Sequence, residues 1–245
     1  MSLTKSFLSS KHFAAKHLAA WVSPAILVLG LGFGQASQAT TVSFTGFSHG
    51  SEAVQLASPF QGTVSAGEFS MSVDGMPLTS FCIDLMQSIR FGQSYSNFSK
   101  VSLTGHNENI SALQLGRFSK LYENYLPTAH TSSTASAAFQ TAIWEIMSDG
   151  KGNLNLSTGM FSLASAFCTT SRSMAEEWLA TLDSKTAGNW SFDKFGSASH
   201  QDQLVGKKVD SQVPVPATFA LIAAGFMGIG ASRKIRAKKE ALASA

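Results

Sequence analysis

The chain has 245 residues and a formal net charge of +3, from 18 basic and 15 acidic side chains. The first 39 residues contribute +3 and residues 213–245 contribute +4, so the segment between them carries −4. The basic isoelectric point therefore arises from the two ends, and nothing in the charge points to a nucleic-acid partner.

The first 39 residues have the layout of a secretory signal peptide. Three lysines form a basic stretch, an apolar run follows from Ala19 to Phe33, and Ser37-Gln38-Ala39 places small residues at the −3 and −1 positions. This order predicts cleavage after Ala39 and export of the rest of the chain.

Residues 40–212 have the size of one domain, and their first half predicts β-structure. Apolar and polar residues alternate over 40–47, 62–73 and 94–103, as they do in half-buried strands. Asp74-Gly75 is a turn signal ahead of a further strand that contains Cys82.

The second half changes to a helical period. A first helix should begin at a cap supplied by Asn109 or Ser111 and end before Pro127. The Ser/Thr-rich segment 128–136 should cap a second helix, in which apolar residues from Phe139 to Met147 recur at helical spacing.

A third helix completes the helical cluster. Ser173-Met174-Ala175-Glu176 matches a capping box that opens it, and residues 189–205 return to strand and loop. Strands first and helices afterwards predict a single α+β domain, with a β-rich first half and a helical cluster.

The side chains that could react with each other lie in one expected strand and one expected helix. Cys82 and Asp84 share a face of the strand. Gln140 and Trp144 lie one turn apart on a flank of the helix. A Cys82 thiolate attacking the Gln140 side-chain carbonyl would expel ammonia and leave an internal thioester. Phe139 and Trp144 are candidates for excluding water, and Asp84 could orient the thiol or be a solvated carboxylate.

These two segments resemble the signatures of the Cys-Gln thioester domain of bacterial surface adhesins. The first reads Phe-Cys-Ile-Asp-Leu at 81–85, and the second reads Phe-Gln-Thr-Ala-Ile-Trp-Glu-Ile at 139–146. Closely similar stretches occur in a PEP-CTERM branch of this family. The resemblance implies a Cys82–Gln140 thioester that attaches the protein covalently to a surface amine or hydroxyl, once per molecule and without enzymatic turnover.

The second cysteine, Cys168, departs from the family's single-cysteine pattern and keeps another interpretation open. In an exported chain, Cys82 and Cys168 can form one disulfide. The protein would then be a passive biofilm or extracellular-matrix envelope protein, with Cys82 disulfide-bonded or merely buried.

Two further patterns do not predict a site. Gly46-Phe47-Ser48-His49-Gly50 matches the G-x-S-x-G nucleophile elbow, but no helical pattern follows it, so a hydrolase is not expected. His106, His130 and His200 are scattered without the i, i+4 spacing of metal ligands, so neither a metal site nor a cofactor is expected.

The C-terminal segment 213–240 has three parts: prolines, an apolar run expected as a transmembrane helix over 217–232, and a basic cluster. The expected signal residues are Pro214, Pro216, Arg233, Lys234 and Arg236. This layout resembles the PEP-CTERM sorting signal of exopolysaccharide-producing Gram-negative bacteria, which exosortase recognises and removes, although Val215 replaces the family's acidic residue. The resemblance implies membrane anchoring in transit, followed by sorting to the cell surface or extracellular matrix.

Overall fold

The computed structural model describes residues 39–103, 110–165 and 169–210. The expected signal peptide, the sorting tail with its transmembrane helix, His106 and Cys168 lie outside these ranges. Within the described ranges, no helix is both long and apolar enough to cross a membrane.

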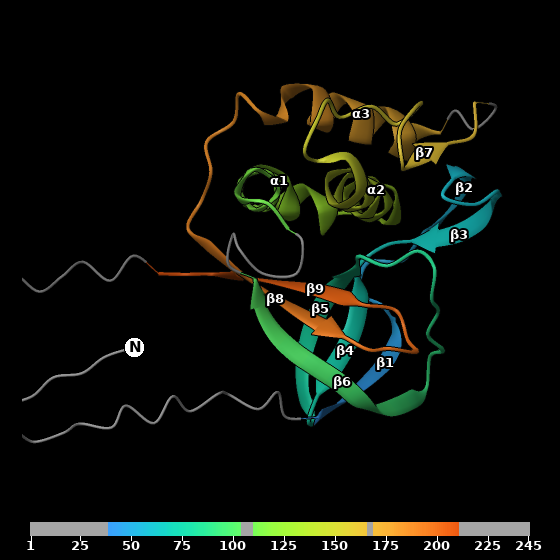
Figure 1. Ribbon diagram of the computed structural model, residues 1–245, viewed down its shortest axis with the longest axis vertical. Helices are drawn as coiled ribbons and strands as arrows, with labels where there is room; N and C mark the ends of the chain where they lie inside the picture. The colour runs from blue at the N-terminus through green and yellow to red at the C-terminus, as the bar shows by residue number, and fades with distance from the viewer. Residues whose placement is uncertain (1–38, 104–109, 166–168, 211–245) are drawn as a thin grey trace, which may run out of the picture. The chain divides into compact units, whose positions relative to one another are not determined.

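Six strands form a closed antiparallel barrel in the order β1-β4-β5-β9-β8-β6 (Figure 1). They are β1 (Ala39–Phe47), β4 (Phe69–Val73), β5 (Met76–Cys82), β6 (Gln93–Leu103), β8 (Trp190–Gly196) and β9 (Gln203–Lys208). The strands expected over 40–47 and 94–103 are β1 and β6. Asp74 and Gly75, with φ of 49° and 83°, form the two-residue turn between β4 and β5, as the sequence predicts.

A smaller sheet, ordered β3-β2-β7, contains β2 (Glu52–Ser58), β3 (Gly62–Ala66) and β7 (Ser162–Leu163). The prediction of a single strand over 62–73 is therefore wrong, because β3 and β4 are separate strands joined by a turn at Gly67 and Glu68. A Cβ added to Gly67 would lie 2.6 Å from the backbone oxygen of Gly50. The chain bends at Gly67, where the two backbones approach closely. The alternation of apolar and polar residues continues through this bend, so the sequence pattern does not show it.

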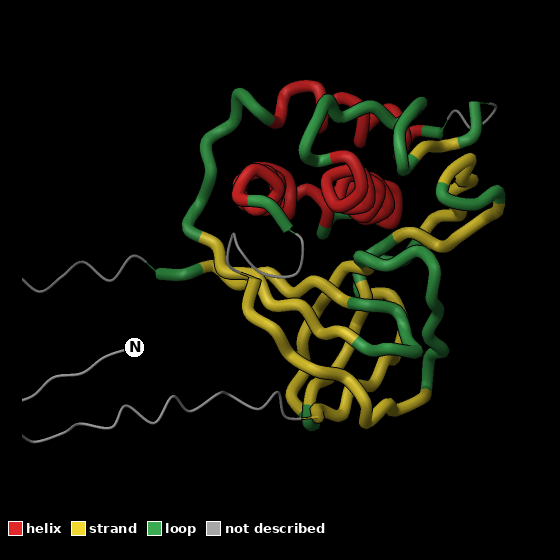
Figure 2. Tube along the Cα trace, in the orientation of Figure 1, coloured by secondary structure: helices red, strands yellow, loops and turns green. Residues whose placement is uncertain are grey.

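Three helices complete the α+β fold: α1 (Ala112–Ala129), α2 (Ser133–Asp149) and α3 (Thr170–Leu182). Figure 1 shows α1 and α2 side by side between the barrel and α3, and Figure 2 shows the same separation of the helices from the barrel. Every residue of α2 from Ala135 to Ile146 is buried. The polar side chains of α2 must therefore find their hydrogen-bond partners inside the protein.

The end of α1 differs from the predicted end. Ser111 caps the helix in a capping box with Gln114, and it is one of the two expected caps. The expectation that the helix stops before Pro127 is wrong, since α1 continues to Ala129. Proline removes one backbone donor, and the final turn is closed instead by the His130 N–H, which donates to the Leu126 oxygen.

The start of α3 also differs from the predicted start. Thr169 is the N-cap, and its hydroxyl accepts a hydrogen bond from the Arg172 N–H at 3.3 Å. Ser173, the expected cap, lies inside the first turn. Threonine and serine have the same capping chemistry, so the local pattern does not decide between them.

Candidate functional site

The end of β5 lies against α2, and this junction brings Cys82 and Gln140 together. Cys82 is the last residue of β5 and lies opposite Gln203 of β9. Its N–H donates to Gln140 Oε1 at 2.9 Å, and Gln140 Nε2 donates to the Cys82 carbonyl oxygen at 2.8 Å. The carboxamide therefore occupies the position that a residue of a neighbouring strand would take.

The register of the barrel explains why Cys82 needs this partner. β4 pairs with β5 as far as Phe69 opposite Ser80, and the chain before Phe69 turns away at Gly67 and Glu68. The N–H and C=O of Cys82 consequently extend past the end of β4. Buried backbone groups are nearly always hydrogen-bonded, and Gln140 supplies both bonds from α2.

The hydrogen bonds also fix the carboxamide relative to the strand. Side chains of a strand stand out of the plane that contains its hydrogen bonds, so the Cys82 side chain leaves the plane in which Gln140 bonds to the Cys82 backbone. The Cys82 N–H is directed at Gln140 Oε1, the atom that would become negative if a nucleophile added to the carbonyl carbon.

The Cys82 thiol is neutral in this environment. Cys82 and Gln140 are each 1% exposed, and burial raises the pKa of the thiol to about 12. Contacts with Trp144 and with the backbone of Asp84 lower that pKa by less than burial raises it. The sulfur donates a hydrogen bond to the Asp84 carbonyl oxygen at 3.1 Å. The thiolate expected from the sequence is therefore not the resting form.

Asp84 follows the end of β5, and its backbone rather than its side chain contacts the sulfur. Its carboxylate accepts a hydrogen bond from the Met86 N–H at 2.8 Å, which fixes the turn after the strand. The negative charge of Asp84 contributes to raising the pKa of the Cys82 thiol. The carboxylate thus shapes the loop and favours the protonated sulfur.

The two aromatic residues expected to exclude water lie on different sides of α2. The Phe139 ring packs against the rings of Phe81 and Tyr122, with centroids 4.7 Å and 5.1 Å away, in the core between helices and barrel. Trp144 is 2% exposed and contacts Phe161. Its indole N–H lacks a hydrogen bond of regular geometry with the described residues, although its contact with the Cys82 thiol lowers the thiol's pKa. We interpret this contact as a weak, off-axis interaction with sulfur.

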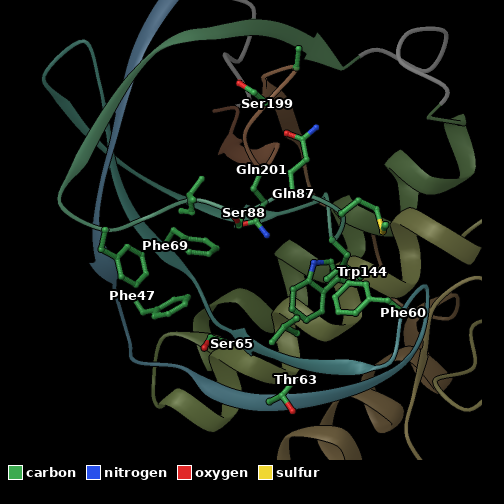
Figure 3. A pocket seen from close by; sticks show the side chains of 16 residues that line it. Phe47, Phe60, Thr63, Ser65, Phe69, Gln87, Ser88, Trp144, Ser199 and Gln201 are labelled. Carbon is green, nitrogen blue, oxygen red and sulfur yellow. The ribbon is translucent and has the colours of Figure 1, made fainter.

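A pocket of about 790 Å³ adjoins this site, and Trp144 forms part of its wall (Figure 3). Its lining combines aromatic rings with hydroxyl and amide groups, and the described side chains that line it carry no formal charge. Three of the rings form a cluster, with Phe47 4.7 Å from Phe69 and 5.2 Å from Phe91. Gln87 is one of the lining residues, and its amide oxygen is buried without a hydrogen-bond partner among the described residues.

Glu145, the neighbour of Trp144, is a buried carboxylate that the sequence analysis did not single out. It is 0% exposed, and burial raises its pKa from 4.5 to about 7. One carboxylate oxygen accepts the Asn155 N–H at 2.6 Å, and the other lacks a partner within the described ranges. The sequence did not predict that Glu145 is buried, because glutamate in a helix usually lies on the exposed face.

The other residues singled out in the sequence lie outside the described part of the chain or apart from Cys82. Cys82 is a free, buried cysteine there, and Cys168 lies outside it. The sorting residues also lie outside it; they are Pro214, Pro216, Arg233, Lys234 and Arg236. His200 packs on Tyr95, with ring centroids 4.2 Å apart.

Two histidines that are distant in the sequence do come together. His49 and His130 both contact the carboxylate of Glu68, at 3.0 Å and 3.3 Å. The sequence analysis missed this group because its members come from three separate segments. No spacing rule along the chain connects residues that meet only in the fold.

Comparison with known proteins adds evidence from both parts of the chain. The C-terminus carries a PEP-CTERM protein-sorting motif. The matching residues are 212–234, and the motif implies export and processing by an exosortase-type enzyme. No curated protein matches the sequence.

A solved structure similar to this one is the N-terminal thioester domain of a surface protein from Clostridium perfringens, determined as a cysteine-to-alanine mutant. It shares 12% sequence identity with this chain, and the alignment covers 57% of this chain and 89% of that chain, with a TM-score of 0.38. The interpretation of Cys82 and Gln140 therefore rests on their own geometry.

Proposed function

We propose that this protein is a surface-sorted covalent binder, in which Cys82 and Gln140 form an internal thioester that is transferred to an amine or hydroxyl of a surface or matrix partner. The observation that carries the proposal is the pair of reciprocal hydrogen bonds between the Cys82 backbone and the Gln140 carboxamide. They hold an electrophile beside a thiol, and both side chains are buried from solvent.

Thioester formation can proceed with groups already present at the site. The Cys82 Sγ–Gln140 Cδ bond forms, the Cδ–Nε2 bond breaks, and the thiol proton moves to the departing nitrogen, so that ammonia leaves. The Cys82 N–H stabilises the negative charge on Oε1 during this step. Because the thiolate and not the thiol is the nucleophile, the proton must pass from the sulfur to the leaving nitrogen as the C–S bond forms.

The second step would use the neighbouring pocket. An amine or hydroxyl entering there would reach the thioester past Trp144, which forms part of the pocket wall. Its attack on the Gln140 carbonyl forms an amide or ester and returns the proton to the Cys82 sulfur. The bond to Gln140 persists, so each molecule reacts once and the protein is not an enzyme with turnover.

The burial of Cys82 supports an alternative function as a passive envelope or matrix protein. A cysteine that is 1% exposed and satisfied by the Asp84 carbonyl is also an ordinary core residue. In that case the Gln140 carboxamide only completes the hydrogen bonds of β5.

Intact mass separates these two functions. The proposal predicts that freshly purified protein is about 17 Da lighter than its sequence, the mass of one ammonia. Methylamine should then add to Gln140, raise the mass to about 14 Da above the sequence and expose one titratable thiol at Cys82. Full mass and no uptake of methylamine in fresh protein would contradict the covalent function.

Substitutions at Cys82 and Gln140 test whether these two residues form the thioester. Cys82→Ala and Gln140→Ala should each retain full mass and take up no amine, whereas Cys168→Ala should behave like the wild type. Gln140→Glu keeps the shape of the side chain but offers a carboxylate, which a thiol attacks far less readily, and should also keep full mass. Gln55→Glu, on the exposed face of β2, is the matched control and should still lose ammonia.

A further inference from the structure

Three side chains from separate segments converge beside the barrel. His49 follows β1, Glu68 lies in the turn between β3 and β4, and His130 is the C-cap of α1. His49 Nδ1 lies 3.0 Å from one Glu68 oxygen, and His130 Nε2 lies 3.3 Å from the other. One nitrogen or oxygen atom from each of the three lies within 4.8 Å of the other two.

The carboxylate at the centre of this group is buried. The Glu68 side chain is 3% exposed, whereas those of His49 and His130 are 31% and 39% exposed. A buried carboxylate is stabilised by a neighbouring positive charge or by metal coordination. A cation bound between the three groups would supply it, and the exposed sides of the two rings leave it a path from solvent.

The surrounding backbone holds the group in place. Gly50 adopts a φ of +79° and approaches Ser133, while Gly67 approaches the Gly50 oxygen, so the two loops lie in direct contact. The Glu68 N–H donates to the Ser136 hydroxyl at 2.9 Å, and the Ser48 N–H donates to the Glu68 carbonyl at 2.8 Å. Both loops are therefore fixed to each other and to the start of α2.

We propose that His49, Glu68 and His130 form a binding site for a divalent transition-metal ion such as Zn²⁺. Two imidazole nitrogens and one carboxylate oxygen are a ligand set that zinc uses, with water in a fourth position. Ligands at zinc's usual bond lengths of about 2.0–2.2 Å lie roughly 3.3 Å from one another in a tetrahedral shell. The spacings of 3.0 Å and 3.3 Å involve different Glu68 oxygens, so the carboxylate would turn to present one oxygen to the ion.

Binding requires both imidazole rings to turn. His49 and His130 are stacked, with centroids 4.6 Å apart and an angle of 12° between their planes. A metal must lie near the plane of each ring to meet its nitrogen lone pair, so each ring would rotate about its side-chain bonds. The ion would join the loop after β1, the β3–β4 turn and the end of α1, next to the start of the helix that carries Gln140.

Titration of the untagged purified protein with Zn²⁺, followed by calorimetry and thermal unfolding, tests this site. We expect one equivalent to bind and to raise the melting temperature, and EDTA to reverse the shift. His49→Ala and His130→Ala should each weaken binding about 10–100-fold or more. His200→Ala, which removes a histidine that packs on Tyr95, is the matched control and should bind as the wild type does.

Two further variants make the result independent of folding and of the thiol. Cys82→Ser should bind Zn²⁺ normally, because Cys82 lies on β5 and is not part of the group. Glu68→Gln keeps the shape of the side chain and should lose most of the affinity. If Glu68→Gln does not fold, Zn²⁺ binding to His49→Ala tests the proposal, because His49 is partly exposed and its loss should disturb the fold less. No saturable binding to the wild type, or unchanged binding to His49→Ala and His130→Ala, would overturn the proposal.

Discussion

At the scale of single residues, burial decides the chemistry of this protein more than residue type does. The Cys82 thiol is neutral because desolvation raises its pKa by more than the contacts with Trp144 and with the Asp84 backbone lower it. The Gln140 carboxamide is ordered because the Cys82 backbone needs both of its hydrogen-bonding groups. Both properties arise from the same junction of β5 and α2.

The buried carboxylate of Glu145 predicts an unusual dependence of stability on pH. Burial raises its pKa from 4.5 to about 7, so the folded state binds the proton more tightly than the unfolded state does. Its contribution to the free energy of unfolding should therefore decrease as the pH rises from about 4.5 to about 7 and stay low above that. Glu145→Gln should remove this decrease and be more stable than the wild type at pH 8, by on the order of 1–3 kcal/mol.

Urea unfolding at pH 5, 6, 7 and 8 measures this effect. Glu177→Gln, on the exposed face of α3, is the matched control and should follow the wild type at every pH. Parallel pH profiles for the wild type and Glu145→Gln would show that Glu145 does not carry a raised pKa.

At the scale of elements, α2 connects the helices to the barrel and to the small sheet. It is buried along most of its length, and it presents Gln140 to β5 and Trp144 to the pocket from one flank. Residues four apart on a helix lie on the same side, so one straight helix positions both groups. Its N-cap, Ser132, belongs to the short connection from α1. His130 lies in the same connection and contacts Glu68.

The cap of α3 gives a test of element boundaries. Thr169→Ala should lower the free energy of unfolding by about 1 kcal/mol, because the Arg172 N–H loses its hydroxyl acceptor. Ser173→Ala is the control from inside the first turn and should change stability by less than about 0.5 kcal/mol. Chemical denaturation of both variants measures the difference. A larger loss for Ser173→Ala would place the cap at the residue that the sequence pattern favoured.

At the scale of the whole molecule, the chain combines the buried Cys82–Gln140 junction with a C-terminal sorting motif. The motif occupies residues 212–234 and is followed by further lysines. A covalent binder needs to stay at the surface where its partner lies, and a sorting signal serves that purpose. The two parts therefore support one function, although each is tested separately.

Deletion of residues 233–239 tests the sorting motif. Without the basic cluster, the positive-inside anchor is lost, so we expect the protein to remain unprocessed or to be released instead of being retained at the envelope. Deletion of residues 241–245, which lie beyond the matched motif, is the control and should leave processing intact. Fractionation with immunoblotting reports both size and location. Unchanged size and location after loss of 233–239 would mean that the segment does not direct sorting.

The sequence by itself determined the local features of this protein. Alternation placed β1 and β6, Asp74-Gly75 specified a two-residue turn, and helical spacing placed Gln140 and Trp144 on one flank of a helix. The sorting motif was also visible, because it is a linear signal. These features depend on residues within one or two turns of each other, which periodicity describes well.

Only the tertiary structure decided which distant groups meet. The fit of Gln140 against Cys82 depends on where β4 stops pairing with β5, and this in turn depends on the close approach of Gly50 and Gly67. The convergence of His49, Glu68 and His130 has the same origin. Long-range contacts leave no periodic signal in the sequence. The neutral state of Cys82 follows from its burial, because desolvation is a property of the folded environment and not of the cysteine itself.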